Sequence, residues 1–137
     1  AAGTVSTMPS GSPASTYHWD GTTWSSVPIN LKEPLNGVWG SSSTDVWTVG
    51  DGGEIAHWYG SSWVSYSSGT TQTLTGIWGS GANDVWAVGN GGTVLHWNGT
   101  AWAQVSVSTT NNLSAVWGSG PVDVWVVGDQ VILHLPL

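Results

Sequence analysis

The sequence predicts an all-β fold, a β-propeller whose blades are about 39 residues long. Three observations predict it: a repeat of that length, a composition poor in helix formers, and short apolar stretches separated by turn residues. The 137 residues include twelve tryptophans, twenty glycines and no phenylalanine. Lys, Glu and Gln are scarce, which disfavours helices. A chain of this length is expected to form one domain.

The repeat becomes visible when the chain is aligned with itself. A Leu-x-(Gly/Ala)-(Val/Ile)-Trp-Gly-Ser motif begins at Leu35 and returns at Leu74 and Leu113, each 39 residues after the last. Asp-Val-Trp, Val-Gly and His-Trp segments recur at the same spacing. Read backwards, the His-Trp segment falls on His18 and Trp19, so the N-terminal part is a half repeat in register. All twelve tryptophans occupy four repeat positions.

This register divides the chain into a tail and a repeat domain. Residues 1–16 are rich in Ser, Thr, Pro and Gly, and we expect no regular core strand there. The repeat domain covers 17–137 and contains a half repeat (17–34), two full repeats (35–73 and 74–112) and a truncated repeat (113–137).

Each full repeat predicts four short antiparallel strands. In the first one, apolar stretches lie at 37–39, 46–49, 55–58 and 63–66. Glycines in the intervening turns supply the positive φ of tight hairpins, at Asp20-Gly21, Gly52-Gly53, Tyr59-Gly60, Gly91-Gly92 and Asn98-Gly99. Four strands per repeat form a propeller blade, whereas a β-solenoid has a shorter period and a sandwich has no repeat.

The fragments add up to about three blades, and known propeller rings begin at four. An open arc of three blades exposes strand edges and two apolar faces. We therefore expect copies of the chain to close or extend the arc, with the strand at Thr22–Val27 completing the last blade of a neighbour. Head-to-tail contacts of this kind give a ring or a filament.

The repeat resembles the tryptophan-rich β-propeller repeats of bacterial secreted and surface proteins. The resemblance covers residues 17–135 and rests on Val-Trp-Gly-Ser, Asp-Val-Trp-x-Val-Gly and His-Trp-x-Gly-x-x-Trp. The turn from Asp20 to Trp24 is similar to the Asp-box of sialidase-type propellers, with one residue missing between Asp20 and Gly21. The resemblance implies the fold. Such repeats occur on lectins, enzymes and scaffolds, so the function has to come from the residues themselves.

The charge balance excludes several classes of function. Eight acidic residues stand against the single cation Lys32, which gives a formal net charge of −7. Nucleic-acid binding and phosphate or carboxylate clamps need several cations, so we expect neither. The absence of cysteine excludes disulfides and thiolate metal sites.

The same composition bears on localisation. No apolar run approaches the roughly 20 residues of a membrane span, so we expect no membrane insertion. The low charge and the small residues Ala1, Ala2 and Gly3, which signal-peptide cleavage typically leaves behind, predict a secreted or cell-surface protein.

Two polar residue types recur with the repeat. We expect Asp45, Asp84 and Asp123 to accept backbone N–H groups in turns; the alternative is calcium, but one carboxylate per repeat is far from its six to eight oxygen ligands. The histidines are expected to join hydrogen-bond networks with an Asp or Ser of the same blade. Ligand contact and zinc are their alternatives, although symmetry spreads them around a ring. They are His18, His57, His96 and His134. No metal or cofactor is expected.

The polar residues keep the repeat symmetry, whereas an active site brings different residue types together at one place. Sialidase-like activity, which the resemblance could imply, would also need arginine, and the chain has none. We therefore predict a non-catalytic protein.

Tryptophan is the remaining excess, and most copies are predicted to fill the core between blades. Those beside hairpin turns are candidates for stacking on neutral glycans: Trp19, Trp24, Trp58, Trp63, Trp97 and Trp102. Weak repeated sites suit a multivalent lectin. The alternative is a structural subunit of an extracellular ring or filament that binds only copies of itself.

Overall fold

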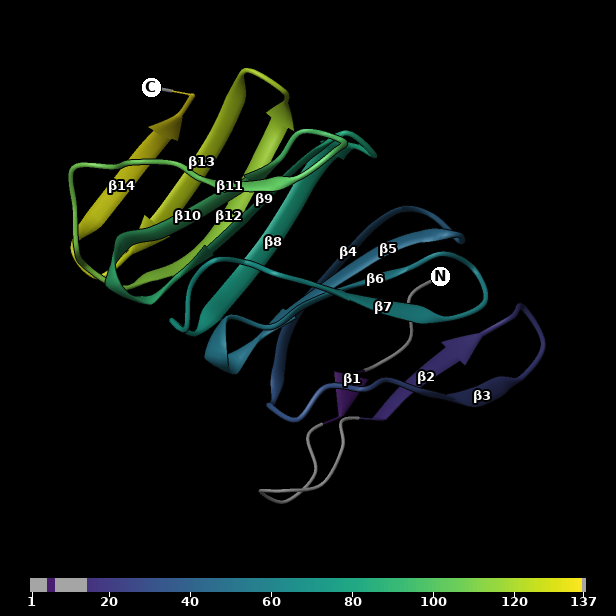
Figure 1. Ribbon diagram of the computed structural model, residues 1–137. Coiled ribbons are helices and arrows are strands. Elements are labelled where there is room, and N and C mark those ends of the chain that lie inside the picture. Colours follow the sequence, from purple (N-terminus) through teal and green to yellow (C-terminus); the bar gives the residue numbers. More distant parts are fainter. Residues whose placement is uncertain (1–4, 7–14, 137) are drawn as a thin grey trace.

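The computed structural model describes residues 5–6 and 15–136, which form an arc of β-propeller blades (Figure 1). Four antiparallel sheets follow one another along the chain, and the first strands of the last three lie side by side. Blade 1 contains β1 (Val5–Ser6), β2 (Ser15–Trp19) and β3 (Trp24–Pro28). Blade 2 contains β4 (Leu35–Ser42), β5 (Asp45–Gly50), β6 (Ile55–Trp58) and β7 (Trp63–Tyr66). Blade 3 contains β8 (Leu74–Gly81), β9 (Asp84–Gly89), β10 (Thr93–Trp97) and β11 (Trp102–Gln104). Blade 4 contains β12 (Leu113–Gly120), β13 (Asp123–Gly128) and β14 (Val131–Leu135).

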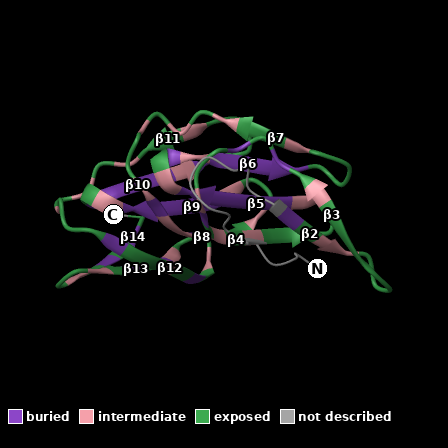
Figure 2. Cartoon of the chain, turned by 90° about the horizontal axis from the view of Figure 1, so that it is seen from below, coloured by how far each residue is buried: buried purple, intermediate pink, exposed green. Residues whose placement is uncertain are grey.

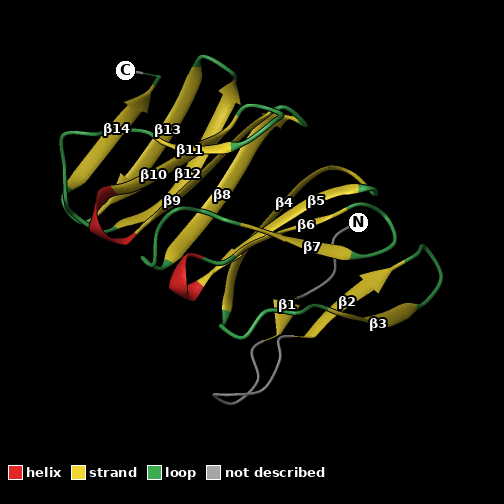
Figure 3. Cartoon of the chain, in the orientation of Figure 1, coloured by secondary structure: helices red, strands yellow, loops and turns green. Residues whose placement is uncertain are grey.

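The prediction of four short strands per 39-residue repeat is confirmed in blades 2 and 3. Two short 3₁₀ turns, η1 (Asp51–Gly53) and η2 (Asn90–Gly92), lie at equivalent places and are red in Figure 3. Each contains the predicted glycine pair with positive φ. A Cβ on Gly53 would lie 2.0 Å from the carbonyl oxygen of Thr70, so this turn also requires glycine for close approach.

The N-terminal segment differs from the expectation in one respect. β2 begins at Ser15, inside the predicted tail, and Val5–Ser6 pairs with it as β1. A free strand edge offers unpaired N–H and C=O groups, which even a two-residue strand can satisfy. The other tail residues, 1–4 and 7–14, lie outside the described residues.

Neighbouring blades are joined by an indole that packs against a glycine. A Cβ placed on Gly79 of β8 would lie 2.6 Å from the ring of Trp39 on β4, and one on Gly118 of β12 would lie 2.7 Å from Trp78 on β8. These glycines provide a socket that any side chain would fill. The junction of blade 2 with blade 3 and that of blade 3 with blade 4 are therefore built by the same two repeat positions.

The core lies between the blades rather than within a single sheet. One cluster joins Trp47, Val49 and Ile55 of blade 2 to Leu74 and Leu95 of blade 3, and a second joins blade 3 to blade 4. Figure 2 shows burial concentrated in the middle strands of blades 2 and 3. In the part of the chain that is described, no helix is long and apolar enough to cross a membrane.

Candidate functional site

A Ser–Asp–His network recurs in blades 2, 3 and 4. In blade 2, Asp45 Oδ1 lies 2.5 Å from His57 Nε2, and its Oδ2 accepts a hydrogen bond from the Ser41 hydroxyl. The corresponding Asp–His distances are 2.6 Å in blade 3 and 2.9 Å in blade 4. Each imidazole also packs against a tryptophan, with ring centroids 4.2 Å apart for Trp47 and His57. The network ties the first three strands of each blade together.

These aspartates differ from the expected turn acceptors. Among the described residues, their carboxylates accept hydrogen bonds from side chains and from no backbone N–H. The reason is the strand register, because β5 places Asp45 diagonally across from His57 on β6. Asp20 is the carboxylate that does accept backbone bonds, from Thr22 and Thr23 at 2.8 Å each, and these bonds hold its pKa below the usual value.

His18 stands apart from the other three histidines. The repeat position that carries Asp45 is occupied by Ser6 in the N-terminal segment. The His18 ring instead lies 5.7 Å from that of Trp58 in blade 2. Among the described residues, no group of three or more His, Asp or Glu side chains could hold a metal ion.

An aspartate in this network is expected to stabilise its blade. Replacing Asp84 by Ala removes the acceptor of Ser80 and of His96, which should lower the free energy of unfolding by about 1 to 3 kcal/mol. The matched control is Asp129→Ala, because that exposed carboxylate makes no hydrogen bond with the described residues. Chemical denaturation measures both. Added calcium should leave both melting temperatures unchanged, and a strong rise would reveal a metal ligand.

A hollow of about 450 Å³ lies between the face of blade 2 and the turns of blade 3. Its polar lining comes from Asp45, His57, Asn83 and Thr100, and its aromatic lining from Trp47, Tyr59, Tyr66 and Trp97. We call this site the aromatic hollow.

The aromatic rings of the hollow form one packed group. Trp47 is central, with ring centroids 5.2 Å from Tyr66 and 4.9 Å from Trp97. The hydroxyls of Tyr59 and Tyr66 hydrogen-bond to each other. Trp47 is buried, Tyr66 is half-buried and Tyr59 is exposed, so the group offers a buried floor and an accessible rim. Trp47 Nε1 and His57 Nδ1 are buried without a hydrogen-bond partner, which is uncommon for buried polar atoms.

The aromatic hollow breaks the repeat symmetry. The positions of Tyr59 and Tyr66 are Asn98 and Val105 in the next repeat, so the same groove between blades 3 and 4 lacks both phenol rings. The repeat pattern points to neither tyrosine, because it consists of the residues that recur. Both tyrosines could have been found as aromatic residues that occur in one repeat and are absent from the equivalent position of the next.

The predicted glycan-binding tryptophans are spread over several places. Trp97 lines the aromatic hollow. Trp58 is buried and donates from Nε1 to the Ser43 carbonyl, and half-buried Trp63 donates to the Thr16 hydroxyl at 3.1 Å. Of the remaining three, Trp19 and Trp102 are half-buried and Trp24 is exposed. The structure thus brings one of the six candidates into the hollow.

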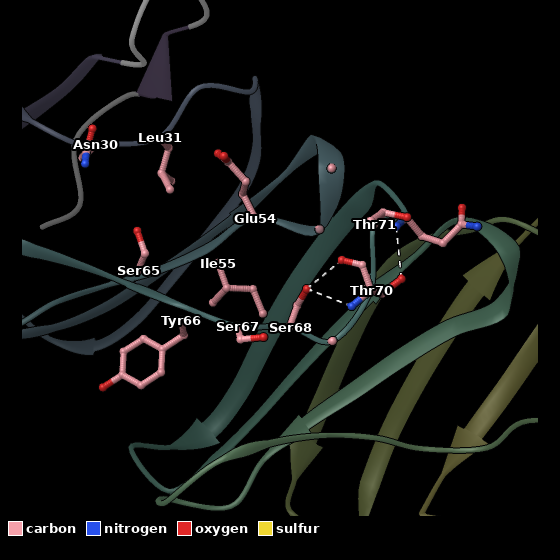
Figure 4. Close-up of a pocket in the computed structure, with 14 residues that line it drawn as sticks. Asn30, Leu31, Glu54, Ile55, Ser65, Tyr66, Ser67, Ser68, Thr70 and Thr71 are labelled. Carbon is pink, nitrogen blue, oxygen red and sulfur yellow. Dashed lines mark hydrogen bonds between the residues drawn. The ribbon is translucent and has the colours of Figure 1, made fainter.

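A second, larger hollow of about 730 Å³ is lined mainly by Ser, Thr and Gly residues (Figure 4). Its hydroxyls are partly engaged with their own loop, because Ser68 Oγ bonds the carbonyl and N–H of Thr70. Tyr66 lines both hollows. This polar hollow therefore offers a single aromatic ring, that of Tyr66.

The two phenols of the aromatic hollow can be tested by titration. The hydrogen bond to Tyr59 raises the pKa of Tyr66 from 10.0 to about 12, and partial burial adds to the shift. Because the pKa of Tyr66 is raised in the folded state, the hydrogen bond between the two phenols contributes fully to stability below pH 10. That contribution is lost as the pH rises from 10 to about 12. Ultraviolet titration should show one late tyrosine in the wild type. In Tyr59→Phe it should move towards 10, and an unchanged titration would contradict the pairing.

No protein-family model and no curated protein matches the chain. Two solved structures of the β-propeller protein YCF48 are similar to it. One, described as YCF48 bound to D1 peptide, has a TM-score of 0.71 and 21% identity, and the match covers 95% of this chain and 45% of that one. The other, YCF48 from Cyanidioschyzon merolae, has a TM-score of 0.69 and 15% identity, with coverage of 92% and 45%. The chain spans less than half the length of either, and the likeness establishes the propeller fold.

Proposed function

We propose that this protein is a non-catalytic, extracellular recognition module that holds a neutral glycan in its aromatic hollow. The observation that carries the proposal is the grouping of Trp47, Tyr59, Tyr66 and Trp97 beside polar groups at one place in the arc. Faces of aromatic rings stack on the apolar faces of sugar rings, and a few polar groups then fix orientation. Exposed Tyr59 and half-buried Tyr66 offer such faces, and buried Trp47 and Trp97 form the floor beneath them.

Charge supports a neutral ligand. The hollow contains Asp45 and no Lys or Arg, and the whole chain has a net charge of −7. Anionic sugars and phosphates would meet repulsion there without a compensating cation. Asp45, Asn83 and Thr100 supply acceptors and donors for hydroxyl groups.

Tryptophan fluorescence during titration with neutral oligosaccharides tests this proposal. A dissociation constant between about 1 μM and 1 mM is expected, and Tyr59→Ala should weaken it at least about tenfold. Tyr17→Ala is the matched control, because Tyr17 is similarly exposed but lies on β2, outside the hollow. A response to peptides and none to glycans would assign the hollow to protein recognition, the kind of ligand present in the structure of YCF48 bound to D1 peptide.

A second function, self-association as a structural subunit, is favoured by the outer face of blade 4. Trp117 and Trp125 are 63% and 43% exposed there, whereas Trp47 and Trp86, at the repeat position of Trp125, are buried. Apolar faces of this kind mark interaction sites. Light scattering coupled to size exclusion is expected to give a mass above that of one chain. A single-chain mass at high micromolar concentration would contradict self-association.

A further inference from the structure

The junction of blade 2 with blade 3 and that of blade 3 with blade 4 follow one rule. The outer face of blade 4 and the side of blade 2 that faces blade 1 carry its unmatched halves. Trp117 is the third copy of the indole that packs on a glycine, and among the described residues it has no socket and is 63% exposed. Gly40 is the third copy of the socket, and the three heavy atoms nearest a Cβ placed on it belong to Asp45 and Val46, not to an indole. Blade 4 therefore presents the indole that the glycine socket of blade 2 would accept.

Other positions of the junction repeat the same mismatch. Ile77 of β8 faces β4 and is 8% exposed, whereas its equivalent Val38 on β4 is 40% exposed. Hydrogen bonds follow the rule too: Asn36 Nδ2 donates to the Leu74 carbonyl at 3.0 Å, and Thr75 Oγ1 donates to the Leu113 carbonyl at 2.6 Å. Ser114 occupies the repeat position of Asn36 and Thr75. Its acceptor in a further junction would be a carbonyl at the repeat position of Leu35.

We propose that the Trp117 face of one copy docks on the Gly40 face of a second copy and forms the same junction that joins β4 to β8. The inference rests on the self-association proposed above and is independent of the glycan site. Trp117 would enter the socket at Gly40 of the second copy, Ser114 would donate to its Leu35 carbonyl, and its Val38 would become buried. Such a contact is heterologous, so repetition gives a ring or a filament.

In this junction, blade 4 of one copy and the N-terminal strands of the second copy together form one blade, which we call the shared blade. His18 on β2 and His134 on β14 occupy the same repeat position, so β14 and the incoming β2 cannot both be the third strand. β14 buries Leu133 and Leu135 in the cluster between blades 3 and 4, whereas the described side chains of β2 include one buried residue, Thr16. β14 is therefore the third strand of the shared blade, and β1 and β2 of the second copy lie outside that blade.

β3 of the second copy then supplies the missing fourth strand. Its position beside blade 2 is held by Ile29 and Leu31, which are buried against Leu35 and Ala56 directly after the strand ends. The register follows from blade 3, where His96 faces Ala103. In the shared blade, His134 of one copy faces Ser25 of the other, a residue that faces His18 within its own chain.

Paired cysteines distinguish β3 paired with β14 of another copy from β3 paired with β2 of its own chain. The chain has no cysteine of its own. The variant His134→Cys with Ser25→Cys should form a disulfide between copies, seen as a dimer or a ladder on a non-reducing gel. Residues 25 and 134 lie at opposite ends of one chain, so a disulfide within a monomer would contradict the proposal. His18→Cys with Ser25→Cys is the geometric control, because the two positions are cross-strand neighbours within the chain.

Variants of single faces test the head-to-tail order. Trp117→Ala damages one face and Val38→Glu the other, and both side chains are exposed within the chain, so each variant should fold. Each alone should be monomeric. An equimolar mixture still contains one intact pair of faces and should give a dimer and nothing larger. Circular dichroism checks folding.

The outcomes separate this inference from self-association itself. A wild type of single-chain mass refutes both. Assembly that survives Trp117→Ala and Val38→Glu leaves self-association standing and refutes this junction. The same holds if the variant His134→Cys with Ser25→Cys assembles without a disulfide between copies.

Discussion

Replacing Trp86 by alanine is expected to lower the free energy of unfolding by about 3 to 5 kcal/mol. Trp86 is 5% exposed, belongs to the cluster between blades 3 and 4, and packs against His96 with ring centroids 4.2 Å apart. Truncation would leave a cavity between two sheets that their hydrogen bonds hold in place. Urea denaturation followed by circular dichroism measures the loss.

The repeat provides a matched control for this variant. Trp125 occupies the same position in blade 4 and packs on its histidine at 4.3 Å, yet it is 43% exposed. Trp125→Ala should therefore cost much less, when measured in the Val38→Glu background so that no second copy covers the face. Equal losses for the two tryptophans would mean that burial between blades does not determine their contribution.

The contrast between these two indoles shows what the sequence could and could not predict. Strand positions followed from a local pattern, because the apolar stretches and the turn glycines recur every 39 residues and their period sets the blade. Burial of an individual tryptophan depends on whether another blade lies beside it. Trp47 and Trp125 have identical local sequences, Asp-Val-Trp, and differ because of neighbours distant in the chain.

The Asp–His network was within reach of the sequence, and its hydroxyl partner was overlooked. Ser41, Ser80 and Ser119 precede their aspartates by four residues and donate to them in blades 2, 3 and 4. The aromatic hollow was not within reach of the repeat pattern, because Tyr59 and Tyr66 come together only through the register of β6 and β7 and through packing against Trp47.

Replacing Gly79 by alanine is the second substitution with a large expected effect. The new Cβ would lie 2.6 Å from the Trp39 ring and 2.8 Å from the carbonyl oxygen of Asp84. The carbonyl belongs to the paired strand β9, so the backbone cannot yield without breaking the ladder between β8 and β9. Overpacking of this kind costs about 1 to 3 kcal/mol, and occupation of the socket by a methyl group should also move Trp39 away from blade 3.

Gly81→Ala is the control, since a Cβ on Gly81 meets nothing within 4 Å and the equivalent residue in blade 2 is Ser42. Its free energy of unfolding should lie within about 0.5 kcal/mol of the wild type. Differential scanning calorimetry of the two variants separates the effect of the socket from that of losing a glycine in the same strand. The same comparison bears on the junction between copies, because a Cβ placed on Gly40 would lie 2.8 Å from the carbonyl oxygen of Asp45, and one on Gly118 would lie 2.6 Å from that of Asp123. If Gly79→Ala were as stable as Gly81→Ala, the indole socket would not determine the fit between blades, within the chain or between chains.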